Sequence, residues 1–161
     1  MSIRIVVYGS PAPQGSKSFK GLAKNGKAIL AESSKKVRPW RQDVKLAAGQ
    51  VRASLALPVL DEALQVRMTF TLPKPLSAPK RRRVFPSKLP DLSKLVRSTE
   101  DALTDAGIWR DDARVIECTA AKRYPGEGPD ALDAPGCVIE IATVAENLST
   151  TSYTAGDNTH G

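Results

Sequence analysis

Apolar and polar residues alternate from Leu64 to Leu72, which is the period of a β-strand that buries one face. Other short apolar segments, rich in β-branched or aromatic residues, predict further strands. These segments are residues 3–8, 107–109, 115–122 and 138–144. Asn25-Gly26 is a strong two-residue turn signal, so residues 17–30 are expected to form a loose hairpin.

Two other segments repeat apolar residues every three or four positions, which is the period of an amphipathic helix. The first stripe is formed by Trp40, Val44, Ala47, Val51 and Leu55. Ser33-Ser34 can cap this helix, and Pro39 fits only in its first turn, so we expect the regular helix between about residues 39 and 54. The second stripe, within residues 91–106, is formed by Leu92, Leu95, Val96, Thr99, Ala102, Leu103 and Ala106.

These elements predict a single α+β domain over residues 1–144, with a mixed β-sheet and two main helices packed on it. The length of 161 residues fits one domain. Residues 145–161 are rich in Ser, Thr, Asn and Gly and are expected to form a disordered polar tail. No apolar run approaches a membrane span and the N-terminus lacks the pattern of a signal peptide, so we expect a cytoplasmic protein without a membrane partner.

The distribution of charge changes this picture, because it favours a polyanionic partner. The net charge is +7 and the pI is about 9.6, which favours nucleic acid. Residues 73–90 contain five prolines, no acidic residue and the run Lys80-Arg81-Arg82-Arg83, which is expected to contact a DNA backbone. In the loop at 10–17, two prolines and Gly15 either direct Lys17 and backbone N–H groups at a phosphate or form a plain connector.

Several chemistries are excluded by residue types. The one histidine, His160, lies in the polar tail, which argues against histidine acid–base, triad or zinc chemistry. Cys118 and Cys137 have neither metal-ligand spacing nor a disulfide framework, and small buried apolar residues in a reducing compartment are the simplest interpretation.

Acidic residues lie at both ends of the second helical segment. Asp91 directly precedes the helix, and Asp111-Asp112 follows the break at 105–107. Carboxylates so placed can meet and hold a divalent metal. Equally, Asp91 can be a helix N-cap and Asp111-Asp112 a solvated turn. On a helical wheel, Ser93, Arg97, Glu100 and Thr104 flank the buried stripe, whereas Lys94 and Asp101 are expected on the far side, toward solvent.

The stretch PDLSKLVRSTEDALTDAG-IWRDDARV resembles the signature of the RusA family of Holliday-junction resolvases, which phages and prophages commonly encode. Members show an Asp-Leu-Asp-Asn-Leu-like helix start, a basic residue one turn later, an Asp-Ala-Leu segment and an Asp-Asp pair opening the next strand. The loop at 9–17, Pro39-Trp40 and Lys122 also match, so the resemblance covers roughly residues 3–142. It implies a RusA-like fold and a homodimeric, Mg²⁺-dependent endonuclease that makes paired nicks across a four-way DNA junction.

The resemblance also implies roles for single residues. Asp91 matches the first catalytic acid and Asp112 the last, and Arg97 stands where a lysine is usual. An arginine still stabilises charge on phosphorus, but it does not donate a proton near neutral pH. Ser93 stands where the family has its second acid, and this departure removes one carboxylate from the metal site.

We hypothesise that Glu100, two turns along the same flank, supplies the missing carboxylate, so that Asp91, Asp112 and Glu100 hold the metal. Glu100 can instead form an ordinary i, i+3 pair with Arg97. Expected partners are branched DNA and a second copy of the chain, with Mg²⁺ as cofactor, Mn²⁺ as its substitute and no nucleotide cofactor. The basic run and Lys122 are expected to bind the DNA. Two alternatives stay open: a branched-DNA-binding protein with weak or no catalysis, and a less structure-selective Mg²⁺ nuclease.

Overall fold

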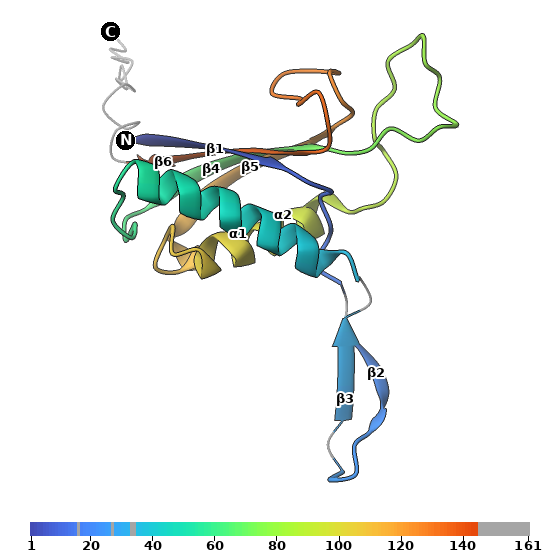
Figure 1. Cartoon of the computed structure of the whole chain (residues 1–161), viewed down its shortest axis with the longest axis vertical. Helices are drawn as coiled ribbons and strands as arrows, with labels where there is room; N and C mark the ends of the chain where they lie inside the picture. The colour runs from blue at the N-terminus through green and yellow to red at the C-terminus, as the bar shows by residue number, and fades with distance from the viewer. Residues whose placement is uncertain (16, 27, 33–34, 145–161) are drawn as a thin grey trace, which may run out of the picture.

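A four-stranded mixed sheet forms the centre of the computed structural model, which describes residues 1–15, 17–26, 28–32 and 35–144 (Figure 1). In spatial order its strands are β1 (Ser2–Tyr8), β6 (Gly136–Thr143), β4 (Leu64–Thr71) and β5 (Val115–Arg123). β4 pairs in parallel with β5, whereas β6 is antiparallel to both of its neighbours. The predicted α+β class and mixed sheet are therefore confirmed.

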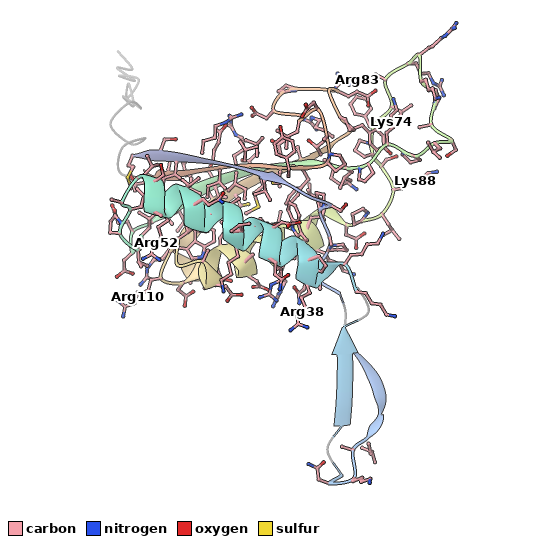
Figure 2. The ribbon with its side chains drawn as sticks, viewed as in Figure 1. Arg38, Arg52, Lys74, Arg83, Lys88 and Arg110 are labelled. Atoms are coloured by element: carbon pink, nitrogen blue, oxygen red, sulfur yellow. The ribbon has the colours of Figure 1, made fainter. Side chains whose placement is uncertain are left out.

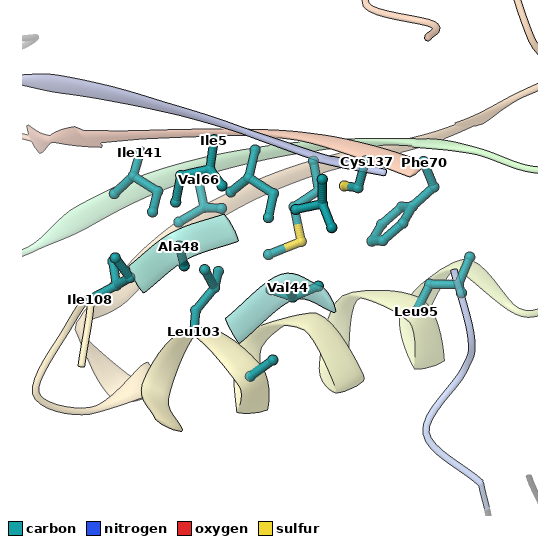
Figure 3. Close-up of a cluster of buried hydrophobic side chains, with 14 of the residues drawn as sticks. Ile5, Val44, Ala48, Val66, Phe70, Leu95, Leu103, Ile108, Cys137 and Ile141 are labelled. Carbon is teal, nitrogen blue, oxygen red and sulfur yellow. The ribbon is translucent and has the colours of Figure 1, made fainter. Parts of the chain in front are cut away.

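Two helices, α1 (Val37–Ser54) and α2 (Leu92–Asp105), cover one face of the sheet (Figure 1). Figure 3 shows the core between these layers, where Val44 of α1 and Leu103 of α2 lie under Val66 and Phe70 of β4. Burying each such side chain contributes about 1.5–3 kcal/mol. The two helices are also joined by a buried hydrogen bond, which the Trp40 indole N–H donates to Thr99 Oγ1 at 3.1 Å.

Most predicted elements are present, and the exceptions have physical reasons. Residues 107–109 form no strand, because only Trp109 makes an isolated bridge, with Leu60. Gly107 has a positive φ of 71° and ends the helix, after which Ile108 and Trp109 turn into the core. Leu55 follows the last turn of α1 and is exposed, so the predicted stripe ends at Val51, four residues earlier than expected. The proposed cap at Ser33-Ser34 and the tail at 145–161 lie outside the described residues.

The hairpin predicted around Asn25-Gly26 is confirmed. Its strands are β2 (Lys17–Leu22) and β3 (Ala28–Glu32), which pair with each other in a separate two-stranded sheet. Figure 1 shows this hairpin extending away from the central sheet and both helices. Within the described residues, neither helix has the length and apolar character needed to cross a membrane.

Candidate active site

Asp91 is presented at the start of α2 by a turn that Lys122 holds in place. Lys122, on β5, donates hydrogen bonds from Nζ to the backbone carbonyls of Lys88 (2.8 Å) and Pro90 (3.0 Å). Asp91 occupies the N-cap position, but its carboxylate caps no backbone N–H of the helix. Its recorded charged partner is Lys94, at 3.7 Å. The carboxylate is therefore exposed and not used to cap the helix.

The loop after β1 lies against the first half of α2. Ser98 is fully buried and donates from Oγ to the Ala12 carbonyl at 2.6 Å. One turn nearer the start of the helix, the Gln14 backbone N–H donates to the Lys94 carbonyl at 3.0 Å. These two bonds join segments about 80 residues apart in the chain and fix the loop as one wall of the site.

A pocket of about 750 Å³ lies beside α2, where this loop, the helix and the segment just before β5 meet. It is lined by Gln14, Gly15, Ser93, Lys94, Val96, Arg97, Glu100, Asp101 and Asp112. Four predicted catalytic residues therefore share one pocket, namely Ser93, Arg97, Glu100 and Asp112. We call it the acidic pocket, because three carboxylates and two cations line it.

Asp101 and Lys94 were expected on the far side of the helix, toward solvent. Lys94 is exposed, as expected, and Asp101 is partly buried, but the expected placement away from the site is wrong. Both line the acidic pocket. Positions around the axis of α2 separate these two residues from the buried stripe, but the pocket spans the exposed surface of the helix between the β1–β2 loop and Asp112. Asp101 is thus a candidate site residue that sequence reasoning missed.

Glu100 is half-buried, and burial is the main reason why its pKa is raised above the ordinary glutamate value. The neighbouring carboxylates of Asp112 and Asp101 raise it further, and the Arg97 guanidinium opposes them. Arg97 and Glu100 make no ion pair within 4.0 Å in the described part of the chain, so the ordinary i, i+3 pair is not formed in this structure. The pocket therefore holds carboxylates that repel one another.

Asp111 and Asp112 differ in environment although they are adjacent. They open a short 3₁₀ helix, η1 (Asp112–Arg114), in which the Ala113 N–H donates to Asp111 Oδ1 at 2.7 Å. This hydrogen bond is the main cause of the lowered pKa of Asp111. The pKa of Asp112 is raised, first by burial and then by its hydrogen bond and charge interaction with Asp111. Asp111 therefore caps η1, and Asp112 lines the acidic pocket.

The carboxylates of the acidic pocket are of the right type to bind a divalent cation, but the three predicted ligands Asp91, Asp112 and Glu100 do not line one pocket together. Carboxylate oxygens are the ligands that Mg²⁺ prefers, and a cation between Glu100 and Asp112 would relieve the repulsion that raises their pKa values. Among the described residues, however, no three His, Cys, Asp or Glu side chains are gathered closely enough to hold a metal. Asp91 lines an adjoining pocket instead. Its role as a third ligand stays a prediction.

The basic run Lys80–Arg83 lies near the tip of the β4–α2 loop, which rises on the side of the sheet away from the helices (Figure 1). Arg83, labelled in Figure 2, donates to the Glu127 carbonyl at 3.2 Å and stacks over the Phe85 ring, 4.9 Å from its centroid. Within the described residues, the four cations of this run line neither the acidic pocket nor its neighbour. Their DNA contact, like that of Lys17 on β2, stays a prediction.

A second basic surface lies on α1, where it meets the C-terminal end of α2. Arg38, Arg41 and Lys45 line a hollow of about 550 Å³ that reaches Asp105 at the end of α2, and Arg41 pairs with that aspartate at 2.9 Å. Their spacing of three and four residues places them on one helical face, which the sequence shows. Which neighbour that face meets depends on how the two helices pack.

A protein-family model described as endodeoxyribonuclease RusA matches residues 9–132. The matched range begins at the end of β1 and includes the wall loop, both helices, η1 and β5, so it contains every residue of the acidic pocket. A search of curated proteins gives no match.

Proposed function

Because the chain belongs to the RusA family, a family of endodeoxyribonucleases that resolve Holliday junctions, we propose that it cuts DNA strands at four-way junctions in the acidic pocket. We further propose that cleavage requires Mg²⁺ or Mn²⁺ and takes the form of paired symmetric nicks during DNA recombination or repair in the cytoplasm. For a phage-encoded chain, that compartment is the host cell's.

One observation supports this proposal above the others: two cations and three mutually repelling carboxylates line one pocket within the family match. Phosphodiester hydrolysis needs both kinds of group, because anionic oxygens must be neutralised while a water is deprotonated. A DNA-binding surface without catalysis has no use for a half-buried carboxylate whose pKa is raised, since burying that charge costs stability.

In the proposed mechanism, Arg97 and Lys94 bind the non-bridging oxygens of the scissile phosphate and stabilise the charge that develops on them. A water oxygen attacks phosphorus, and the water's proton passes to a carboxylate oxygen of Glu100. The bond to the leaving sugar oxygen breaks, and that oxygen takes up a proton from solvent to become a hydroxyl. Glu100 lines the same pocket as Arg97 and Lys94, so its carboxylate is placed to accept the proton of a water beside the bound phosphate. Arg97 keeps its proton throughout, because its pKa stays above about 12.

Glu100 and Asp112 would hold the divalent cation, with Asp91 as the proposed third carboxylate. When bound, Mg²⁺ lowers the pKa of water and neutralises charge on the phosphate. Ser93 lines the same pocket and would orient water without adding negative charge. Lys122 acts through backbone carbonyls beside Asp91, so we assign it to positioning that carboxylate in addition to any DNA contact.

We propose a homodimer, because a two-fold axis presents two acidic pockets to two strands of one junction. The test uses end-labelled four-way junction, linear duplex and single strand, each with Mg²⁺, Mn²⁺ or EDTA. Symmetric nicks on the junction alone are expected. Tight binding without nicking in either metal would identify a branched-DNA-binding protein, and cutting of all three substrates would identify a less selective nuclease.

Variants assign the carboxylates. Asp112→Asn and Glu100→Ala are each expected to abolish metal-dependent nicking while the junction is still bound. Glu117→Gln is the matched control, because Glu117 is exposed and pairs with Gln65 on β4, outside the acidic pocket. If Glu100→Ala cuts as fast as the native chain, Glu100 neither accepts the proton nor replaces the missing acid at Ser93.

A further inference from the structure

A second pocket, of about 580 Å³, adjoins the acidic pocket and plays no part in the proposed mechanism. Gln14, Gly15 and Lys94 line both pockets, so the two share a wall. We call the second one the proline pocket, because six prolines and the Tyr124 ring supply much of its lining. Its volume is within the range of pockets that enclose small molecules.

The lining of the proline pocket combines flat apolar surface with positive charge. The proline rings offer apolar surface against which the face of a nucleobase can pack, whereas the Tyr124 ring, at 7% exposure, adds little free surface. Lys36, Lys88 and Lys94 supply three cations, against one carboxylate, Asp91. A ligand that matches both features has a flat apolar ring and an attached anion. A nucleotide has both.

The walls of this pocket are fixed. The loop carrying Ala12 and Gln14 is bonded to α2, as described above. Tyr124 is buried at 7% exposure, and the Lys74 ammonium lies 6.0 Å from its ring centroid. Figure 2 shows Lys74 and Lys88 on the side of the molecule where the β4–α2 loop departs. A ligand therefore meets a formed surface and does not have to order one.

We propose that the proline pocket receives one unstacked base of the junction strand, next to the phosphate bound in the acidic pocket. This inference rests on the proposed function, and it adds to it a binding site for the nucleotide beside the cleaved bond. Because the pockets share a wall, a base in one places its own phosphate at the opening of the other. Unstacking costs least where base pairing is already interrupted, as at a branch point. The pocket therefore favours branched over continuous duplex DNA.

The experiment reports on the base directly. Four-way junctions carry 2-aminopurine in turn at each position beside the branch point, and emission is recorded with EDTA to prevent cutting. For the native chain we expect a several-fold rise at one position upon saturation. Ser10→Phe places a ring at the edge of the pocket without removing a contact that holds the fold, and we expect it to abolish this rise.

Ser54→Phe is the matched control, since Ser54 is exposed in the last turn of α1, about 25 Å along the helix axis from Lys36. It should give the native rise. Lys36→Gln with Lys88→Gln tests the charged rim without filling the pocket. We expect it to reduce the slope of log affinity against log salt by about 1–2, as lost phosphate contacts do.

Several outcomes would overturn the inference. If junction saturated with the Ser10→Phe chain shows the same rise in 2-aminopurine emission as with the native chain, the unstacked base lies elsewhere. A junction that the native chain binds and nicks without any fluorescence change would refute the base pocket while the proposed function stands. Failure to bind or nick any junction would refute both. A Ser10→Phe chain that loses its dimer, with no fluorescence change in the native complex, would assign the pocket to a protein partner.

Discussion

Replacing Ser98 by alanine should loosen the wall between the two pockets. Ser98 is fully buried on α2, and its Oγ lies 2.6 Å from the Ala12 carbonyl and 3.1 Å from the Leu95 carbonyl. The hydroxyl has one proton, and the shorter contact identifies Ala12 as its main acceptor. The substitution removes this donor and leaves the Ala12 carbonyl without it.

The magnitude follows from the burial of both groups. A buried polar group that loses its partner costs about 1–3 kcal/mol, which is expected to lower the free energy of unfolding by the same amount. For a chain of this length each kcal/mol corresponds to about 2–4 °C in Tm. The loop should then move relative to α2, so nicking of the four-way junction is expected to fall at temperatures where the protein remains folded.

Thr99→Val is the matched control. Thr99 is also fully buried on α2 and accepts the Trp40 indole N–H, so its loss should cost similar stability without freeing the loop. Denaturant unfolding and junction nicking at 20–25 °C are measured for both variants. Equal loss of nicking in the two, or a change below about 0.5 kcal/mol in Ser98→Ala, would refute the assignment of this hydrogen bond as the support of the loop.

Three further predictions concern titration and positioning. The pKa of Glu100 is raised in the folded chain, so ionisation of this carboxyl costs stability as pH rises through that pKa. Glu100→Gln should therefore have a higher Tm than the native chain at pH 7, and the two Tm values should converge near pH 4. A Tm difference that does not change with pH would contradict the reasoning. Lys122→Met removes the donor to the Pro90 carbonyl, and nicking should fall more than stability does. If the variant binds and nicks the junction as well as the native chain does, the turn before Asp91 does not need this hydrogen bond. Burial raises the pKa of both thiols and does so most for Cys137. A thiol reagent at pH 8 should therefore modify Cys118 slowly and Cys137 only on unfolding, as mass spectrometry can measure. Rapid labelling of Cys137 in the native chain would contradict its burial.

The sequence by itself determined the elements and their buried faces. Alternation identified β4, and the stripe of α2 identified the buried residues Leu95, Thr99 and Leu103. Both periods arise from backbone geometry, which is local and therefore visible in a single chain. The motif around α2 also indicated the family that the family-model match confirms.

Only the tertiary structure decided which of these residues share a site. A helical wheel gives angles about one axis, but the neighbours of each side chain are set by long-range contacts, such as that between Ser98 and Ala12. Those contacts brought Asp101 into the acidic pocket, placed Asp91 in the adjoining one and left the Lys80–Arg83 run near a distant loop tip. The same packing turned residues 107–109 into the core, because burying Ile108 and Trp109 outweighs their preference for a strand.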